Sequence, residues 1–154
     1  MITSERKEAA SIGQCINTAS GFLSVGNSLS NIQDGVQYFK YYIAPCATTL
    51  AFSCELFLKA IYAMENNGDM CKGHYLEELY GKLSVETQGR ICAEYNQGQG
   101  FPSIAQCLHM HNTTFESFRY LYEENECSVD VPSLKLLAYS LSNACKDMWR
   151  LRER

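Results

Sequence analysis

The sequence has little of what would mark a secreted, membrane-spanning or metal-dependent protein. Among its 154 residues no apolar run approaches the roughly 18 residues that a membrane span needs. The first residues, MITSERKEAA, are charged and polar where a secretory signal would be apolar. No C-x-x-C pair occurs among the eight cysteines, so the spacing of a zinc ribbon or a thioredoxin-type pair is missing. We therefore expect a cytoplasmic protein that does not bind a membrane.

Positive charge is also scarce. The formal net charge of −4 argues against a generic polyanion binder, although it is compatible with a local basic groove. The densest basic stretch runs from Lys146 to Arg154, where Asp147 and Glu153 dilute the arginines, and we interpret it as a solvated helix end. Phosphate-loop and dinucleotide fingerprints are absent, and no cofactor is predicted.

Strand patterns and prolines are rare as well, and what remains is helical periodicity. The chain has only three prolines, and its apolar residues recur at steps of three and four rather than alternating. We predict one all-α domain over residues 1–154, an up-and-down bundle of four to six helices. The expected helices cover residues 5–33, 38–66, 75–82, 84–97, 103–125 with an interruption at 112–114, and a last helix from about 132.

The cysteines fit this helical core. Cys15, Cys54 and Cys145 each fall within an apolar helical stripe, which predicts reduced thiols serving as small core residues.

The polar residues Glu55 and Lys59 stand out within the most apolar helix. They are four residues apart in the favourable order for an ion pair, and their neighbours are almost all apolar. The pair either organises the helix or belongs to a polar site inside the bundle.

His74 stands at the start of the next predicted helix. Its imidazole is expected either to cap that helix, with Glu77 as the accompanying acid, or to bridge to a carboxylate such as Glu55.

Two further stretches are candidates for chemistry. Cys107 and His111 have the i, i+4 spacing of two metal ligands, but no further ligand pair lies nearby and no metal is predicted. Arg119 follows Phe115 by four residues, so its guanidinium is placed to stack on aromatic rings or to bind phosphate. The structural alternative is an aromatic core stripe with Arg119 beside it, paired with Glu116 or Glu123.

These segments resemble the HEPN superfamily (higher eukaryotes and prokaryotes nucleotide-binding domain). The similarity lies in Glu55-Leu-Phe-Leu-Lys59-Ala followed by His74-Tyr-Leu-Glu-Glu-Leu79, and in the aromatic-Arg-Tyr stretch that begins at Phe118. The resemblance covers roughly residues 38–125. It implies a helical bundle that dimerises, found in ribonucleases of toxin–antitoxin or antiphage systems and in non-catalytic nucleotide- or RNA-binding members.

The resemblance also implies the catalytic motif of the ribonuclease members, an Arg followed, after four to six intervening residues, by a His. No His stands at that spacing after Arg6, Arg90 or Arg119. We therefore expect a non-catalytic homodimeric module, binding a nucleotide, RNA or an antitoxin-type protein, in which Glu55, Lys59, His74 and Arg119 line a polar groove. One alternative is an unconventional metal-independent ribonuclease that uses His74 or His109 with Arg119. Another is a purely structural helical protein.

Overall fold

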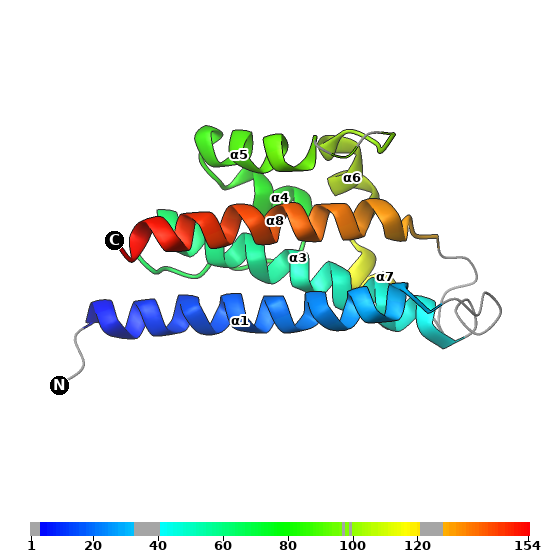
Figure 1. Cartoon of the computed structure of the whole chain (residues 1–154), viewed down its shortest axis with the longest axis horizontal. Coiled ribbons are helices and arrows are strands. Elements are labelled where there is room, and N and C mark those ends of the chain that lie inside the picture. The colour runs from blue at the N-terminus through cyan, green and yellow to red at the C-terminus, as the bar shows by residue number, and fades with distance from the viewer. Residues whose placement is uncertain (1–3, 33–40, 97, 99, 121–127) are drawn as a thin grey trace.

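Three long helices lie side by side in the structure, a computed structural model that describes residues 4–32, 41–96, 98, 100–120 and 128–154. They are α1 (Ser4–Ser30), α3 (Ile43–Glu65) and α8 (Val131–Arg152). Figure 1 shows α1 running opposite to α3 and α8. The described residues contain no strand, and the predicted all-α bundle is confirmed.

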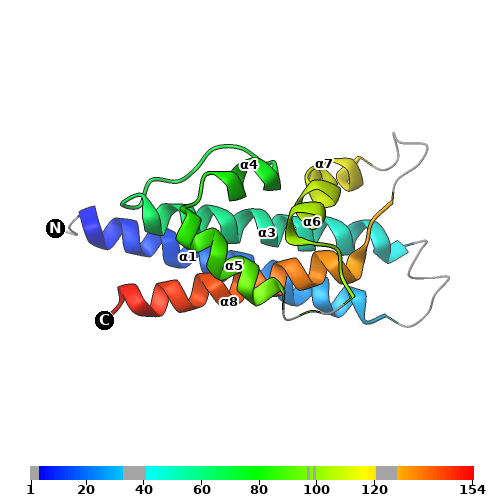
Figure 2. The same cartoon turned by 90° about the horizontal axis from the view of Figure 1, so that it is seen from above.

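Four shorter helices cover the other sides of α3 and α8. They are α4 (Leu76–Gly81), α5 (Val85–Tyr95), α6 (Ile104–His111) and α7 (Thr114–Arg119). α5 packs on α8, whereas α4 and α7 pack on α3. In Figure 2, α4 and α7 lie on the same side of α3. This arrangement leaves α3 in the centre of the molecule, in contact with α1, α4, α7 and α8.

The apolar periodicity of α3 explains its central position. Its buried residues occur on nearly every side of the helix, as expected for a helix surrounded by others. By length and composition α3 is also long and apolar enough to cross a membrane, since an 18-residue stretch of it has a mean hydropathy of 1.3. However, 67% of that stretch is buried inside the bundle, as is usual for the core helix of a soluble protein.

Small residues let α1 approach α3 closely. Ser53 Oγ donates to the carbonyl of Ala19 at 2.9 Å, and the Cys15 thiol lies 3.3 Å from the carbonyl of Leu56. A Cβ added at Gly26 would come within 2.7 Å of the Leu50 side chain. The glycine is therefore required by the packing of the two helices.

The predicted helix boundaries agree with the structure within a few residues where residues are described. Pro45 lies in the first turn of α3, where its missing N–H is no loss. The side chains of Ser84 and Ser103 cap α5 and α6, and the predicted interruption falls between α6 and α7 at Asn112–Thr113. Residues 33, 38–40, 97 and 121–125 of the predicted helices lie outside the described residues.

The predicted place of the cysteines in the helical core is confirmed for Cys54 and Cys145. Cys54 and Cys145 are fully buried, Cys15 is half-buried, and all seven described cysteines are free thiols. Burial raises the pKa of Cys145 to about 12, which keeps this thiol protonated at neutral pH.

Candidate functional site

Glu55 is a buried carboxylate in the middle of the apolar helix α3. Its side chain is only 2% exposed, because α3 is covered on most sides. A charge in such a place is costly unless it is paired. The question for this site is therefore which groups face Glu55.

Two cationic or titratable side chains meet the same oxygen of Glu55. Lys59 Nζ lies 2.8 Å from Oε1, and His74 Nδ1 lies 2.9 Å from it. Lys59 comes from the next turn of α3, and His74 from the extended segment before α4. Of the two roles predicted for His74, the bridge to Glu55 is confirmed.

The capping role predicted for His74 is wrong. Tyr75 occupies the N-cap position of α4 and makes no side-chain cap hydrogen bond. Instead, the backbone N–H of Glu77 donates to Oδ1 of Asn112 at 2.9 Å. Because Asn112 follows α6, the free backbone N–H at the start of α4 finds its acceptor in a distant part of the chain. The local sequence around His74 does not indicate this contact.

The second oxygen of Glu55 has no hydrogen-bond partner. Oε2 is buried, and none of the described residues contacts it with a donor. A buried acceptor without a donor lowers stability by about 1–3 kcal/mol. Such unsatisfied groups are rare in folded proteins, and a role in a functional site is one of the explanations for them.

Exposure differs sharply among the three side chains. Lys59 is 17% exposed and His74 is 59% exposed, against 2% for Glu55. The carboxylate is thus hidden and Lys59 is mostly buried beside it. Of the three side chains, His74 is the one that is largely exposed to solvent.

Arg119 lies at the end of a column of aromatic rings. Its guanidinium carbon is 5.1 Å from the ring centroid of Phe115 and 4.7 Å from that of Tyr120. Phe115 stacks on Phe52 of α3 with centroids 4.9 Å apart, and Phe52 meets Phe22 of α1 edge-on at 4.8 Å. The structure therefore supports the predicted stacking of Arg119.

The alternative partners of Arg119 do not replace this stacking. Among the described residues no ion pair joins Arg119 to Glu116, and its guanidinium donates to the hydroxyl of Tyr120 at 2.9 Å. Glu123 lies outside the described residues.

The aromatic column and the Glu55 cluster share one side of α3. Phe52 and Glu55 are three residues apart on this helix, so their side chains are neighbours. Figure 2 shows α7, which carries Arg119, and α4, which follows His74, on that same side. We call this surface the cationic–aromatic face and define it by Phe52, Lys59, His74, Phe115 and Arg119.

His109 stands apart from this face. Its Nδ1 lies 2.7 Å from Oε1 of Glu77, and both side chains are exposed. Within the described part of the chain, no hydrogen bond or ion pair joins His109 or Arg119 to His74. The structure brings together Glu55, Lys59 and His74, and it leaves the other two candidates in separate contacts.

Cys107 and His111 face α8 rather than a shared ligand. The Cys107 thiol lies 3.5 Å from the carbonyl of Ser133, and His111 Nε2 lies 3.0 Å from Ser133 Oγ. Since the Ser133 hydroxyl donates to the carbonyl of Asp130, it accepts from Nε2–H of a neutral imidazole. Burial lowers the pKa of His111, which the nearby Asp130 carboxylate only partly opposes.

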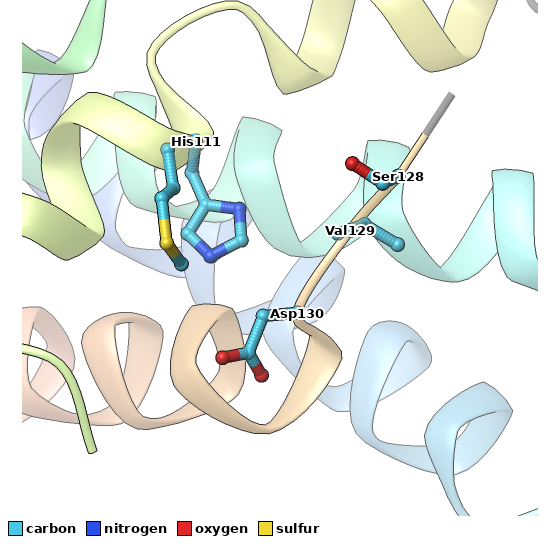
Figure 3. Close-up of a pocket in the computed structure, with 5 residues that line it drawn as sticks. His111, Ser128, Val129 and Asp130 are labelled. Carbon is cyan, nitrogen blue, oxygen red and sulfur yellow. The ribbon is translucent and has the colours of Figure 1, made fainter. Parts of the chain in front are cut away.

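His111 also lines a pocket at the N-terminal end of α8. Figure 3 shows its ring and the Asp130 carboxylate around the same space, with Ser128 and Val129 on the segment leading to α8. No group of three metal-ligating side chains occurs in the described ranges.

Sequence reasoning missed the contribution of Phe52 to the candidate site. The signal was its position, three residues before Glu55 on the same helix face, but its stacking partner Phe115 is 63 residues away in the chain.

Comparison of the chain with family models, curated proteins and solved structures finds no match in any of the three.

Proposed function

We propose that this protein is a non-catalytic, HEPN-like helical module that dimerises and binds a nucleotide or RNA through its cationic–aromatic face. The observation that supports the proposal best is that two polar contacts lie on one side of α3. Lys59 and His74 meet Glu55 there, and Arg119 lies separately over the Phe115 ring, which stacks on Phe52 of the same helix. In this proposal the module acts in the cytoplasm, in a toxin–antitoxin or antiphage system.

The chemistry of the face suits an unpaired nucleic acid. Proteins that bind single strands combine cations that meet phosphates with aromatic rings or arginine planes on which bases stack. Here Lys59 supplies a cation, the exposed His74 imidazole supplies a ring nitrogen that can hydrogen-bond to phosphate, and Arg119 over Phe115 supplies a stacking plane. Because the net charge of the chain is −4, binding must depend on this local face.

The proposal is tested by titrating a fluorescent single-stranded RNA with the protein and following anisotropy. Replacing Arg119 by Ala removes one charge and one stacking plane, so we expect affinity to fall about tenfold. Arg90→Ala is the matched control. Arg90 is an exposed arginine on α5, paired with Glu86 at 2.9 Å, and α5 packs on α8 rather than on α3.

Equal affinities for the two variants would contradict the assignment of this face. Absence of RNA binding by the unmodified protein would contradict the nucleic-acid part of the proposal. Dimerisation is checked separately by light scattering, where a dimer has twice the chain mass of 17.4 kDa.

One observation favours a second candidate, the unconventional metal-independent ribonuclease. A buried carboxylate that accepts from Nδ1 of an exposed imidazole orients the ring and leaves Nε2 for proton transfer, and Glu55 and His74 have this arrangement. In this alternative His74 takes the proton of the RNA 2′-hydroxyl, whose oxygen bonds to the adjacent phosphorus while the P–O5′ bond breaks. The leaving 5′-oxygen takes up a proton from water, and Arg119 stabilises the negative charge on the phosphoryl oxygens.

Incubation of labelled RNA with the protein in EDTA decides between the candidates. The ribonuclease predicts cleavage that His74→Ala abolishes and that His109→Ala, which alters the separate contact with Glu77, retains. Loss of cleavage in His109→Ala with retention in His74→Ala would move the catalytic role to His109. Intact RNA with the unmodified protein is the result that the binding module predicts.

A further inference from the structure

Two pockets share Met110 of α6 as a lining residue, and neither is lined by a residue of the cationic–aromatic face. The first has a volume of about 480 Å³ and is lined by Met110, His111, Ser128, Val129 and Asp130. The second has a volume of about 560 Å³ and is lined by Pro102, Ala105, Gln106, His109 and Met110. Each volume lies within the usual range for sites that hold small organic molecules.

The first pocket has a negative and a polar wall. The Asp130 carboxylate lies beside it, half-buried, and accepts from the backbone N–H of Ser133 at 3.1 Å (Figure 3). His111 is 1% exposed, and both of its ring nitrogens already face hydroxyl groups, Nε2 at 3.0 Å and Nδ1 at 3.5 Å. A ligand here meets a carboxylate and a neutral imidazole.

The second pocket is mainly apolar. Pro102, Ala105 and Met110 contribute hydrocarbon and thioether surface, and Gln106 and His109 complete its lining. Among the described residues, neither pocket has a lysine or an arginine in its lining. A phosphate or carboxylate ligand would therefore meet the charge of Asp130 with no cationic side chain of these residues to offset it.

We propose that the two pockets form one binding site for a small organic cation. Its ammonium group lies at the carboxylate of Asp130, and its apolar body passes Met110 toward Pro102 and Ala105. This site has the opposite charge preference to the cationic–aromatic face, so it goes beyond the proposed function and does not depend on it.

The test uses hexylammonium chloride as the probe and the methyl signals of ¹³C-labelled methionine as the readout at pH 7. The Met110 signal is assigned with Met110→Leu. We expect saturable movement of this signal, and an affinity about three- to fivefold higher for hexylammonium than for hexanol, the strength of a partly exposed charge pair. Hexanoate should bind more weakly than hexanol.

Two variants separate charge from apolar contact. Asp130→Asn retains a capping side chain at the start of α8 and removes only the charge, so it should abolish the preference for the amine over the alcohol. Ala105→Phe fills the second pocket from an exposed position on α6 and should reduce the affinity for both probes.

Three results would each overturn the proposal. They are a Met110 signal that does not move, an equal response of all five methionines, and an unchanged amine preference in Asp130→Asn.

Discussion

At the scale of single residues, two buried titratable side chains, Glu55 and His111, stand out in the described part of the chain. Glu55 and His111 are both about 1% exposed, yet they are satisfied differently. Both nitrogens of His111 face hydroxyl groups, whereas one oxygen of Glu55 has no donor among the described residues. The first is a structural hydrogen-bonding group, and the second belongs to the candidate site.

Removal of the two partners of Glu55 should have unequal effects on stability. Lys59→Met leaves a buried carboxylate short of its closest cation, and we expect the free energy of unfolding to fall by about 2–3 kcal/mol. His74→Ala removes a largely exposed partner and should lower it by less than about 1 kcal/mol. Urea titrations of both variants at pH 7 measure the difference. A larger loss in His74→Ala than in Lys59→Met would contradict the account of this cluster.

His111 should make stability depend on pH. Burial lowers its pKa in the folded protein below the ordinary value of 6.5, so the unfolded chain takes up a proton first as the pH falls. The stabilisation that His111 contributes is therefore complete above about pH 6.5 and is lost as the pH falls through its lower folded pKa.

Thermal unfolding of the unmodified protein and of His111→Asn between pH 7.5 and 5 checks this prediction. The difference in melting temperature between the two proteins should shrink toward pH 5, because Asn cannot take up the proton. A constant difference over this range would contradict it.

At the scale of elements, helix packing explains residues that helix propensity alone would disfavour. α1 contains glycines in its interior, each of which lowers helix stability by up to about 1 kcal/mol relative to alanine. A Cβ at Gly21 would meet nothing within 4 Å, whereas one at Gly26 would collide with the buried Leu50. Only the second glycine has a packing reason.

Gly21→Ala and Gly26→Ala form a matched pair that tests this reading of the α1–α3 contact. We expect Gly21→Ala to raise the free energy of unfolding by about 0.5–1 kcal/mol through helix propensity. Gly26→Ala should lower it by about 1–2 kcal/mol, since overpacking against Leu50 outweighs the gain in propensity. Chemical denaturation followed by circular dichroism measures both, and a gain in Gly26→Ala would show that α1 does not approach α3 this closely.

Elements that depend on local pattern could be predicted from the sequence, and contacts between distant segments mostly could not. The apolar residues at steps of three and four placed α3 correctly, and α5 and α6 begin within one residue of their predicted starts. The Asn112 contact that satisfies the start of α4 joins positions 35 residues apart.

Glu65 shows the same limit of local reasoning. At the end of α3 it accepts from the backbone and hydroxyl of Ser84 and from the hydroxyl of Thr87, joining α3 to the start of α5. Although burial raises its pKa, these hydrogen bonds outweigh that effect and lower it overall. No local pattern indicates such a contact, because its residues meet only after the chain has folded.

At the scale of the whole molecule, a chain with a net charge of −4 has Lys59 and Arg119 on one side of its central helix. The Glu55 carboxylate that pairs with Lys59 is buried, and the His74 imidazole that contacts the same carboxylate is exposed. Together with the aromatic column, this arrangement supports the proposed binding surface.

The most direct test of the proposed function is to map a short single-stranded RNA onto the protein by amide chemical shifts in ¹⁵N-labelled samples. The account predicts that the largest shifts gather around Phe52, Lys59, His74, Phe115 and Arg119, and that they shrink as salt is raised. Shifts centred instead on α5 and the exposed side of α8, or no shifts at low salt, would contradict it.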